Sequence, residues 1–136
     1  MRIFLDANIL FSAAKSDGAI RLLLALLARS GHVCCADGYV IAEASRNLAV
    51  KATGGLANLE IILRGVEVTS AHPADSARMR ELPLPEKDRP VLAAAIRLGC
   101  EALVTGDRTH FGSLFGDTFH GVTIYSPRSL ADKLLK

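Results

Sequence analysis

The sequence predicts a single α/β domain with a mostly parallel sheet, on three observations. Short apolar segments alternate with longer segments of helical periodicity along almost the whole chain. Half of the 136 residues are hydrophobic, and a chain of this length can bury one core. No internal repeat, low-complexity segment or linker divides residues 1–136. Strands that alternate with helices favour a parallel sheet covered by helices on both faces.

The predicted strands are short apolar runs. The first, residues 3–5, ends at Asp6, and the second, residues 32–36, follows Gly31, which ends the preceding helix. Residues 66–69, 102–105 and 122–125 are the remaining strand candidates, and the run at 102–105 is closed by Gly106 and Asp107.

Helices are predicted between these strands. Asn8 is expected to cap a helix that begins at Ile9, and Asp17 to cap a second one. Asp88 is expected to cap a strong helix in which Pro90 is tolerated in the first turn. Residues 72–85 hold three of the five prolines and are expected to mix a short helix with a loop. The helical ranges after the first are 17–29, 39–51, a segment ending at 63, 89–98, 111–115 and a last helix from 129.

The composition argues against several classes of protein. The longest apolar run is too short to cross a bilayer, and Asp6 precedes any signal-like stretch, so a cytoplasmic protein without a membrane segment is expected. The three cysteines form no C-x-x-C pair and the four histidines no H-E-x-x-H motif, so neither a zinc site nor a disulfide is expected. The net charge of +2 does not by itself indicate nucleic-acid binding.

Four acidic residues are expected to meet at one edge of the sheet. Asp6 and Asp107 each follow a predicted strand, and parallel strands end at the same edge. Crossover helices begin at that edge, where Asp88 stands at a helix start. Glu43 lies about five residues into its helix, roughly 7 to 8 Å along the axis, so its side chain can reach back to the edge.

The chemistry of these four acids indicates a metal site. Neighbouring carboxylates repel one another, and burying them without partners costs free energy. A hard divalent cation relieves both costs, and ligation by oxygen alone favours Mg²⁺ or Mn²⁺. Such ions generate hydroxide and stabilise charge on a phosphodiester. We therefore predict Asp6, Glu43, Asp88 and Asp107 to be both the metal ligands and the catalytic residues of a nuclease.

Each acid also has an ordinary structural interpretation. Asp6 can order a turn, Asp88 and Asp107 can cap helices, and Glu43 can lie on a solvated helix face. Their agreement on one sheet edge favours the site. The other acidic residues lack this placement and are expected to be caps or surface charges.

Several motifs resemble one protein family over nearly the whole chain. These are Phe4-Leu5-Asp6-Ala7-Asn8, Glu43 in its helix, Lys87-Asp88-Arg89-Pro90-Val91-Leu92-Ala93-Ala94-Ala95, Leu103-Val104-Thr105-Gly106-Asp107 and the closing residues 122–128. The sequence resembles the PIN domain family, specifically its toxin branch. The resemblance implies a Rossmann-like three-layer α/β/α sandwich with a mostly parallel five-stranded sheet. It further implies a Mg²⁺- or Mn²⁺-dependent endoribonuclease that acts as the VapC-like toxin of a toxin–antitoxin pair, with a small antitoxin protein as partner. Asp6, Glu43, Asp88 and Asp107 match the family's acidic quartet, and Asn8 and Thr105 match polar residues that support it.

Further features concern substrate and assembly. Arg46, Lys51 and Arg108 lie near the acids in sequence and are candidates for RNA phosphate contacts, although solvated charges are the simpler interpretation for each. The helix at 20–27 is apolar nearly all round, which fits either complete burial or a homodimer interface. The alternatives to a toxin ribonuclease are a PIN-fold module that binds RNA or protein without cutting it, an RNA-processing enzyme and a structure-specific DNase.

Overall fold

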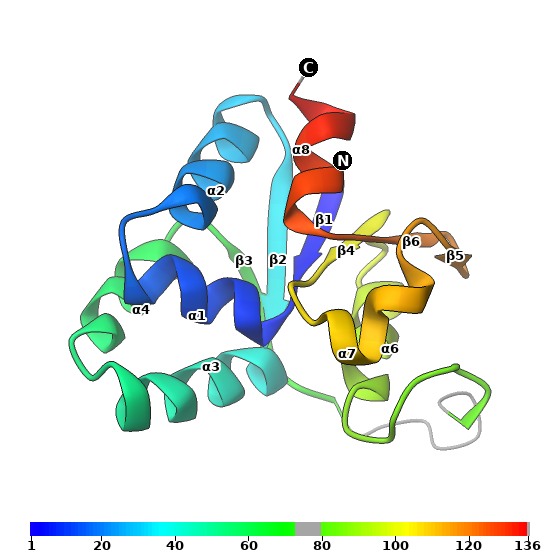
Figure 1. Ribbon diagram of the computed structural model, residues 1–136, viewed down its shortest axis with the longest axis horizontal. Helices are drawn as coiled ribbons and strands as arrows, with labels where there is room; N and C mark the ends of the chain where they lie inside the picture. Colours follow the sequence, from blue (N-terminus) through cyan, green and yellow to red (C-terminus); the bar gives the residue numbers. More distant parts are fainter. Residues whose placement is uncertain (73–79, 136) are drawn as a thin grey trace.

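A six-stranded sheet forms the centre of the molecule. The computed structural model describes residues 1–72 and 80–135 (Figure 1). The strands lie in the order β3-β2-β1-β4-β6-β5, and all neighbours are parallel except β5 and β6. The bounds are β1 Arg2–Leu5, β2 Val33–Asp37, β3 Glu67–Thr69, β4 Ala102–Val104, β5 Thr118–Phe119 and β6 Val122–Tyr125. The α/β class is confirmed, and the expected five parallel strands gain one antiparallel edge strand of two residues.

Helices flank this sheet. In Figure 1, α1 to α4 gather around the β3–β2 side, and α6 and α7 lie on the β4–β6 side. Among the described residues, no helix is long and apolar enough to span a membrane. The bounds are α1 Ala7–Lys15, α2 Ala19–Arg29, α3 Gly38–Lys51, α4 Gly55–Leu63, α6 Arg89–Arg97, α7 Arg108–Phe111, a 3-10 turn at Gly112–Leu114, and α8 Pro127–Leu134. Of the segment expected to mix helix and loop, residues 73–79 lie outside the described part of the chain.

Two helix caps differ from the expectation. Asp6, rather than Asn8, is the N-cap of α1, because β1 passes into the helix with a single residue between them. Gly18, rather than Asp17, is the N-cap of α2, and no side chain caps that end. Asp88 stands at the N-cap of α6, but its side chain accepts no hydrogen bond from the first turn. Its carboxylate is therefore available for other contacts.

The core lies along the central strands. All residues of β4 and the last three of β1 are buried, which is the uninterrupted apolar pattern of strands covered on both faces. The three cysteines are buried free thiols. In α2, Leu23 and Leu27 are buried, whereas Leu22 is 59% exposed. The helix is therefore not wholly enclosed, and it leaves apolar surface on the molecule.

Candidate active site

Asp6 stands where β1, β4 and α1 meet. Its backbone amide donates a hydrogen bond to the carbonyl oxygen of Val104 (3.1 Å), which places it at the carboxyl edge of the sheet. Its Oδ1 accepts a hydrogen bond from the amide of Ala7 (2.7 Å), the first residue of α1. The residue is only 4% exposed. The first turns of α1, α3 and α7 all lie near this edge, at the lower end of β1 in Figure 1.

Two neutral side chains hold the other oxygen of Asp6. Oδ2 accepts hydrogen bonds from the Thr105 hydroxyl (2.8 Å) and the Asn8 amide nitrogen (3.2 Å). The same Asn8 nitrogen also lies in donor range of Thr105 Oγ1 (3.1 Å). Thr105 is fully buried and in turn accepts from the amide of Asp107 (3.1 Å). Asn8 and Thr105 therefore join the two acids that follow β1 and β4.

A glycine permits this close approach. The amide of Gly106 donates to Asn8 Oδ1 (2.7 Å), and a Cβ at position 106 would lie 3.3 Å from that oxygen. A side chain there would crowd this oxygen, so that Asn8 or the turn would have to shift by a few tenths of an ångström. Each residue of the Thr105-Gly106-Asp107 motif therefore makes a specific contact in the site.

Asp107, Asp88 and His110 form a second group. Asp107 caps α7, its Oδ1 accepting from the amide of His110 (3.1 Å). The Nδ1 of His110 donates to Asp107 Oδ2 (2.9 Å) and lies 3.0 Å from Asp88 Oδ2. The contact with Asp88 lacks hydrogen-bond geometry, and Asp88 Oδ2 is a buried atom without a hydrogen-bond partner. Among the described residues, Asp88, Asp107 and His110 are the group whose ligand atoms converge closely enough to hold one metal ion.

Glu43 faces this region from α3. It is half-buried, and Tyr39 lies four residues earlier on the same face of the helix. The Tyr39 hydroxyl donates to the carbonyl oxygen of Lys87 (2.6 Å), the residue before Asp88. This bond ties the start of α3 to the turn that carries Asp88.

The pKa values of these side chains depend on the neighbouring carboxylates. Burial raises the pKa of Asp6 to about 6, the Thr105 and Ala7 hydrogen bonds oppose the rise, and the charges of Glu43 and Asp88 add to it. Burial also raises the pKa of Asp88, with Asp107 adding to the rise and His110 opposing it. The pKa of Tyr39 is raised by burial and then by Glu43 and Asp88. The structure therefore brings Asp6, Glu43, Asp88 and Asp107 into one electrostatic cluster, as the topology predicted.

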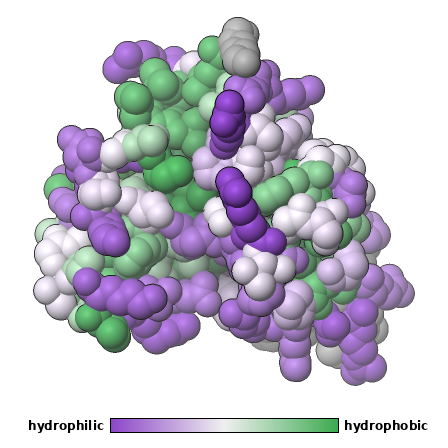
Figure 2. All heavy atoms as spheres, viewed as in Figure 1, coloured by the Kyte–Doolittle hydropathy of each residue, from purple (hydrophilic) through white to green (hydrophobic). Residues whose placement is uncertain are grey.

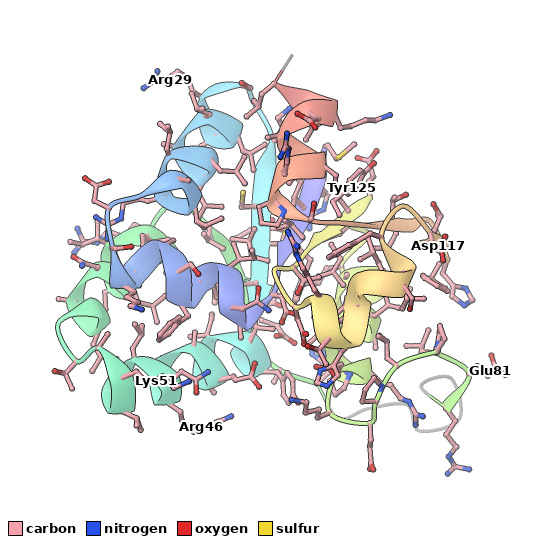
Figure 3. All side chains as sticks on the ribbon, viewed as in Figure 1. Arg29, Arg46, Lys51, Glu81, Asp117 and Tyr125 are labelled. Atoms are coloured by element: carbon pink, nitrogen blue, oxygen red, sulfur yellow. The ribbon has the colours of Figure 1, made fainter. Side chains whose placement is uncertain are left out.

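The three candidate phosphate-binding residues lie at different distances from the acids. Arg46 interacts electrostatically with Tyr39, and Arg108 is exposed directly after Asp107, so both border the cluster. Lys51 ends α3, roughly 12 Å along the axis from Glu43, and its Nζ lies 6.0 Å from the centre of the Phe11 ring. Figure 3 shows Arg46 and Lys51 projecting from α3. Lys51 therefore lies away from the acids.

Sequence reasoning missed two polar side chains at this edge. His110 was excluded with the other histidines because it belongs to no zinc motif, although its place three residues after Asp107 is one helical turn away. The structure therefore places a nitrogen atom beside two of the four acids, at a position where only oxygen atoms were expected. Asp37 ends β2 at the same edge and is 3% exposed. It caps α3 through Val40 (3.2 Å) and lies 3.7 Å from Arg97, so its charge already has a partner.

Comparisons with known proteins agree with this fold. A PIN domain family model matches residues 2–109. A chain of VapBC2 from Rickettsia felis, solved bound to a DNA fragment from its promoter, is similar with a TM-score of 0.67 and 18% identity, covering 93% of this chain and 98% of that one. VapC20 from Mycobacterium tuberculosis, a toxin that cleaves the sarcin–ricin loop, has a TM-score of 0.61 and 16% identity over 87% of this chain and 97% of its own. A chain of VapBC-1 from nontypeable Haemophilus influenzae has a TM-score of 0.60 and 14% identity over 94% and 99%. No curated protein matches in sequence.

Proposed function

The chain belongs to the PIN domain family, and from this premise we propose that it is a metal-dependent endoribonuclease that acts as the toxin of a type II toxin–antitoxin pair. One observation carries the proposal: Asp6, Glu43, Asp88 and Asp107 come from four separate elements and meet at one sheet edge. Among the described residues, the basic side chain that contacts these acids is His110, whose Nδ1 lies 2.9 Å from Asp107 and 3.0 Å from Asp88.

The donor set fits a divalent cation. Asp88 Oδ2 is buried without a hydrogen-bond partner, an arrangement that costs free energy unless a ligand occupies it. Asp6, Glu43, Asp88 and Asp107 would hold Mg²⁺ or Mn²⁺. When bound, such an ion supplies an activated water and charge stabilisation for phosphodiester hydrolysis.

The remaining residues have supporting roles in this proposal. Thr105 and Asn8 orient the Asp6 carboxylate by donating hydrogen bonds to its Oδ2. Arg46 and Arg108 border the acids and would contact substrate phosphates. We do not include Lys51 in that role, because its ammonium lies over Phe11.

The proposed partners are RNA, an antitoxin and a second copy of the chain. Two of the similar structures are described as VapBC, and a ribonuclease acting on cellular RNA in the cytoplasm needs an inhibitor. An antitoxin segment with an arginine or lysine would neutralise the four carboxylates. For the homodimer, Figure 2 shows an apolar area over α2, where Leu22 is 59% exposed. A monomeric mass by light scattering would refute the dimer.

Cleavage assays test the proposal. Purified protein is expected to cut single-stranded or loop RNA with Mg²⁺ or Mn²⁺ and to stop in chelator. Asp88→Asn should lower the rate by orders of magnitude with an unchanged circular dichroism spectrum, whereas the exposed Asp117→Asn should leave it unchanged. Cleavage that persists in chelator contradicts the mechanism. A wild type that binds RNA without cutting it indicates a binding module, and one that cuts only single-stranded DNA indicates a DNase.

Growth experiments test the toxin role separately. Expression of the wild type should arrest growth, Asp6→Asn should be harmless, and co-expression of the antitoxin should restore growth. If an enzyme that cleaves RNA in the assay is harmless when expressed, the chain is an RNA-processing nuclease.

A further inference from the structure

His110 is the nitrogen donor that enters the acidic cluster. It lies on α7, and its backbone amide is fixed by Asp107 Oδ1 at 3.1 Å. The side chain is 28% exposed, and its Nδ1 points between the carboxylates of Asp107 (2.9 Å) and Asp88 (3.0 Å). Asp107 is the N-cap of α7 and Asp88 is the N-cap of α6, so the imidazole ring lies between the starts of two helices.

Hydrogen bonding does not account for the whole arrangement. The Nδ1 atom of His110 carries at most one hydrogen, and that hydrogen is donated to Asp107. Asp88 Oδ2, at nearly the same distance, is left buried and without a hydrogen-bond partner. A group that binds all three atoms at once would satisfy both carboxylates and the ring.

The separations of these atoms match those around a small divalent ion. Adjacent donors of an octahedral ion with bonds of about 2.1 Å lie about 3.0 Å apart, the edge of the octahedron. The Nδ1 to oxygen separations are 2.9 and 3.0 Å, and all three donor atoms lie within 4.8 Å of one another. The two distances from His110 Nδ1 are thus those expected between adjacent ligands of one such ion.

We propose that His110 Nδ1 is a metal ligand beside Asp88 and Asp107, and that this nitrogen makes the site select Mn²⁺ over Mg²⁺. This inference rests on the proposed metal-dependent function, and it specifies Mn²⁺ as the ion that the enzyme uses. Mg²⁺ is bound mainly through oxygen and retains its waters, whereas imidazole suits the first-row transition ions. If His110 merely oriented Asp107, its removal would weaken the binding of both ions to the same extent.

Metal titrations of matched variants separate these roles. His110→Asn is the central variant, because the asparagine amide can place an oxygen near the position of Nδ1 and so keep a donor while removing the nitrogen. His110→Ala removes the donor altogether. His32→Asn is the control, because His32 precedes β2 at the opposite edge of the sheet and contacts the N-terminal amine (3.2 Å). Circular dichroism establishes that each variant is folded.

Calorimetry and thermal unfolding with each ion give the first readout. His110→Asn is expected to lower the affinity for Mn²⁺ by about tenfold or more, the scale of losses around metal sites, and to leave the affinity for Mg²⁺ close to that of the wild type. His110→Ala should lower both, with the larger loss for Mn²⁺. His32→Asn should match the wild type. Equal losses for the two ions in His110→Asn would overturn the inference.

Electron spin echo spectroscopy of bound Mn²⁺ gives a direct readout. Nitrogen-14 modulation from a coordinated imidazole is expected in the wild type and in His32→Asn, and it should vanish in His110→Asn. Its absence from the wild type overturns the nitrogen ligand but leaves the proposed nuclease intact. A wild type that binds neither ion overturns both, and normal Mn²⁺ binding with nitrogen modulation but no cleavage of any RNA overturns the nuclease alone.

Discussion

Neutralising Asp6 should change how the stability of the metal-free protein depends on pH. The Asp6 carboxylate is 4% exposed, and two side chains and one backbone amide donate to it. Burial nevertheless outweighs these hydrogen bonds and raises the pKa from its ordinary value of 3.8 to about 6. The ionised form is thus disfavoured in the folded protein. Asp6→Asn keeps the size of the side chain and removes its titration.

The direction and magnitude of this pH dependence of stability follow from proton linkage. Between pH 4 and 6 the folded state binds more protons at Asp6 than the unfolded state, so the free energy of unfolding falls as pH rises through this window. A shift of about 2 units, at about 1.4 kcal/mol each, amounts to about 3 kcal/mol. Because the unfolded carboxyl is already partly ionised at pH 4, the stability of Asp6→Asn minus that of the wild type should be about 2.5 kcal/mol greater at pH 7 than at pH 4. This corresponds to roughly 10 °C in melting temperature for a domain of this size.

Urea and thermal denaturation of chelator-treated protein between pH 4 and 7 measure this difference. Asp88, whose pKa is also raised by burial, is present in both proteins, so its contribution largely cancels. The exposed Asp17→Asn serves as the surface control. Added Mg²⁺ or Mn²⁺ should flatten the wild-type profile, because the ion favours the ionised carboxylate. A stability difference that is constant across this pH range would refute the reasoning.

Four further substitutions test the packing around the site and the proposed dimer. Thr105→Val removes a buried hydroxyl that three groups use, and it should cost about 1–3 kcal/mol in urea unfolding while lowering cleavage. Tyr39→Phe loses the hydrogen bond to Lys87 and should cost about 1 kcal/mol while weakening metal binding, measured by calorimetry; unchanged metal affinity would show that the bond does not position the turn. Leu27→Ala, at a fully buried position, should cost about 2–5 kcal/mol, whereas Leu22→Asp should leave the monomer folded and shift the light-scattering mass from dimer to monomer.

The strand pattern could be predicted because the central strands are buried on both faces. Short continuous apolar runs such as residues 3–5 and 102–104 are typical of strands that are covered on both faces. The edge strand β5 was missed, because two residues show no periodicity. It pairs with β6 through a two-residue turn at His120 and Gly121, both with positive φ (49° and 85°), and the two threonine hydroxyls at 118 and 123 lie 2.8 Å apart across the strands.

The caps were harder to predict than the elements. A cap is selected by where the preceding strand ends, and several polar residues compete near each helix start. Asp6 and Asn8 are both good cap residues, and Asp6 takes the role because β4 holds its amide at the end of the sheet. Asn8 is thereby released to bridge Thr105 and Gly106, which gives it a different function from the one its residue type suggested.

The sequence alone determined the order of the elements and the edge at which the four acids meet, because both follow from the direction of parallel strands and their crossover helices. Tertiary structure decided what surrounds each acid. Asp37 and Asp88 both stand at helix starts, yet Asp37 meets Arg97 and Asp88 is left with an unpaired buried oxygen beside His110. These contacts join residues from different elements, and their distances depend on packing that no local pattern encodes. The edge at which the acids meet could therefore be predicted from the chain, whereas the contact between His110 of α7 and Asp88 at the start of α6 became visible only in the tertiary structure.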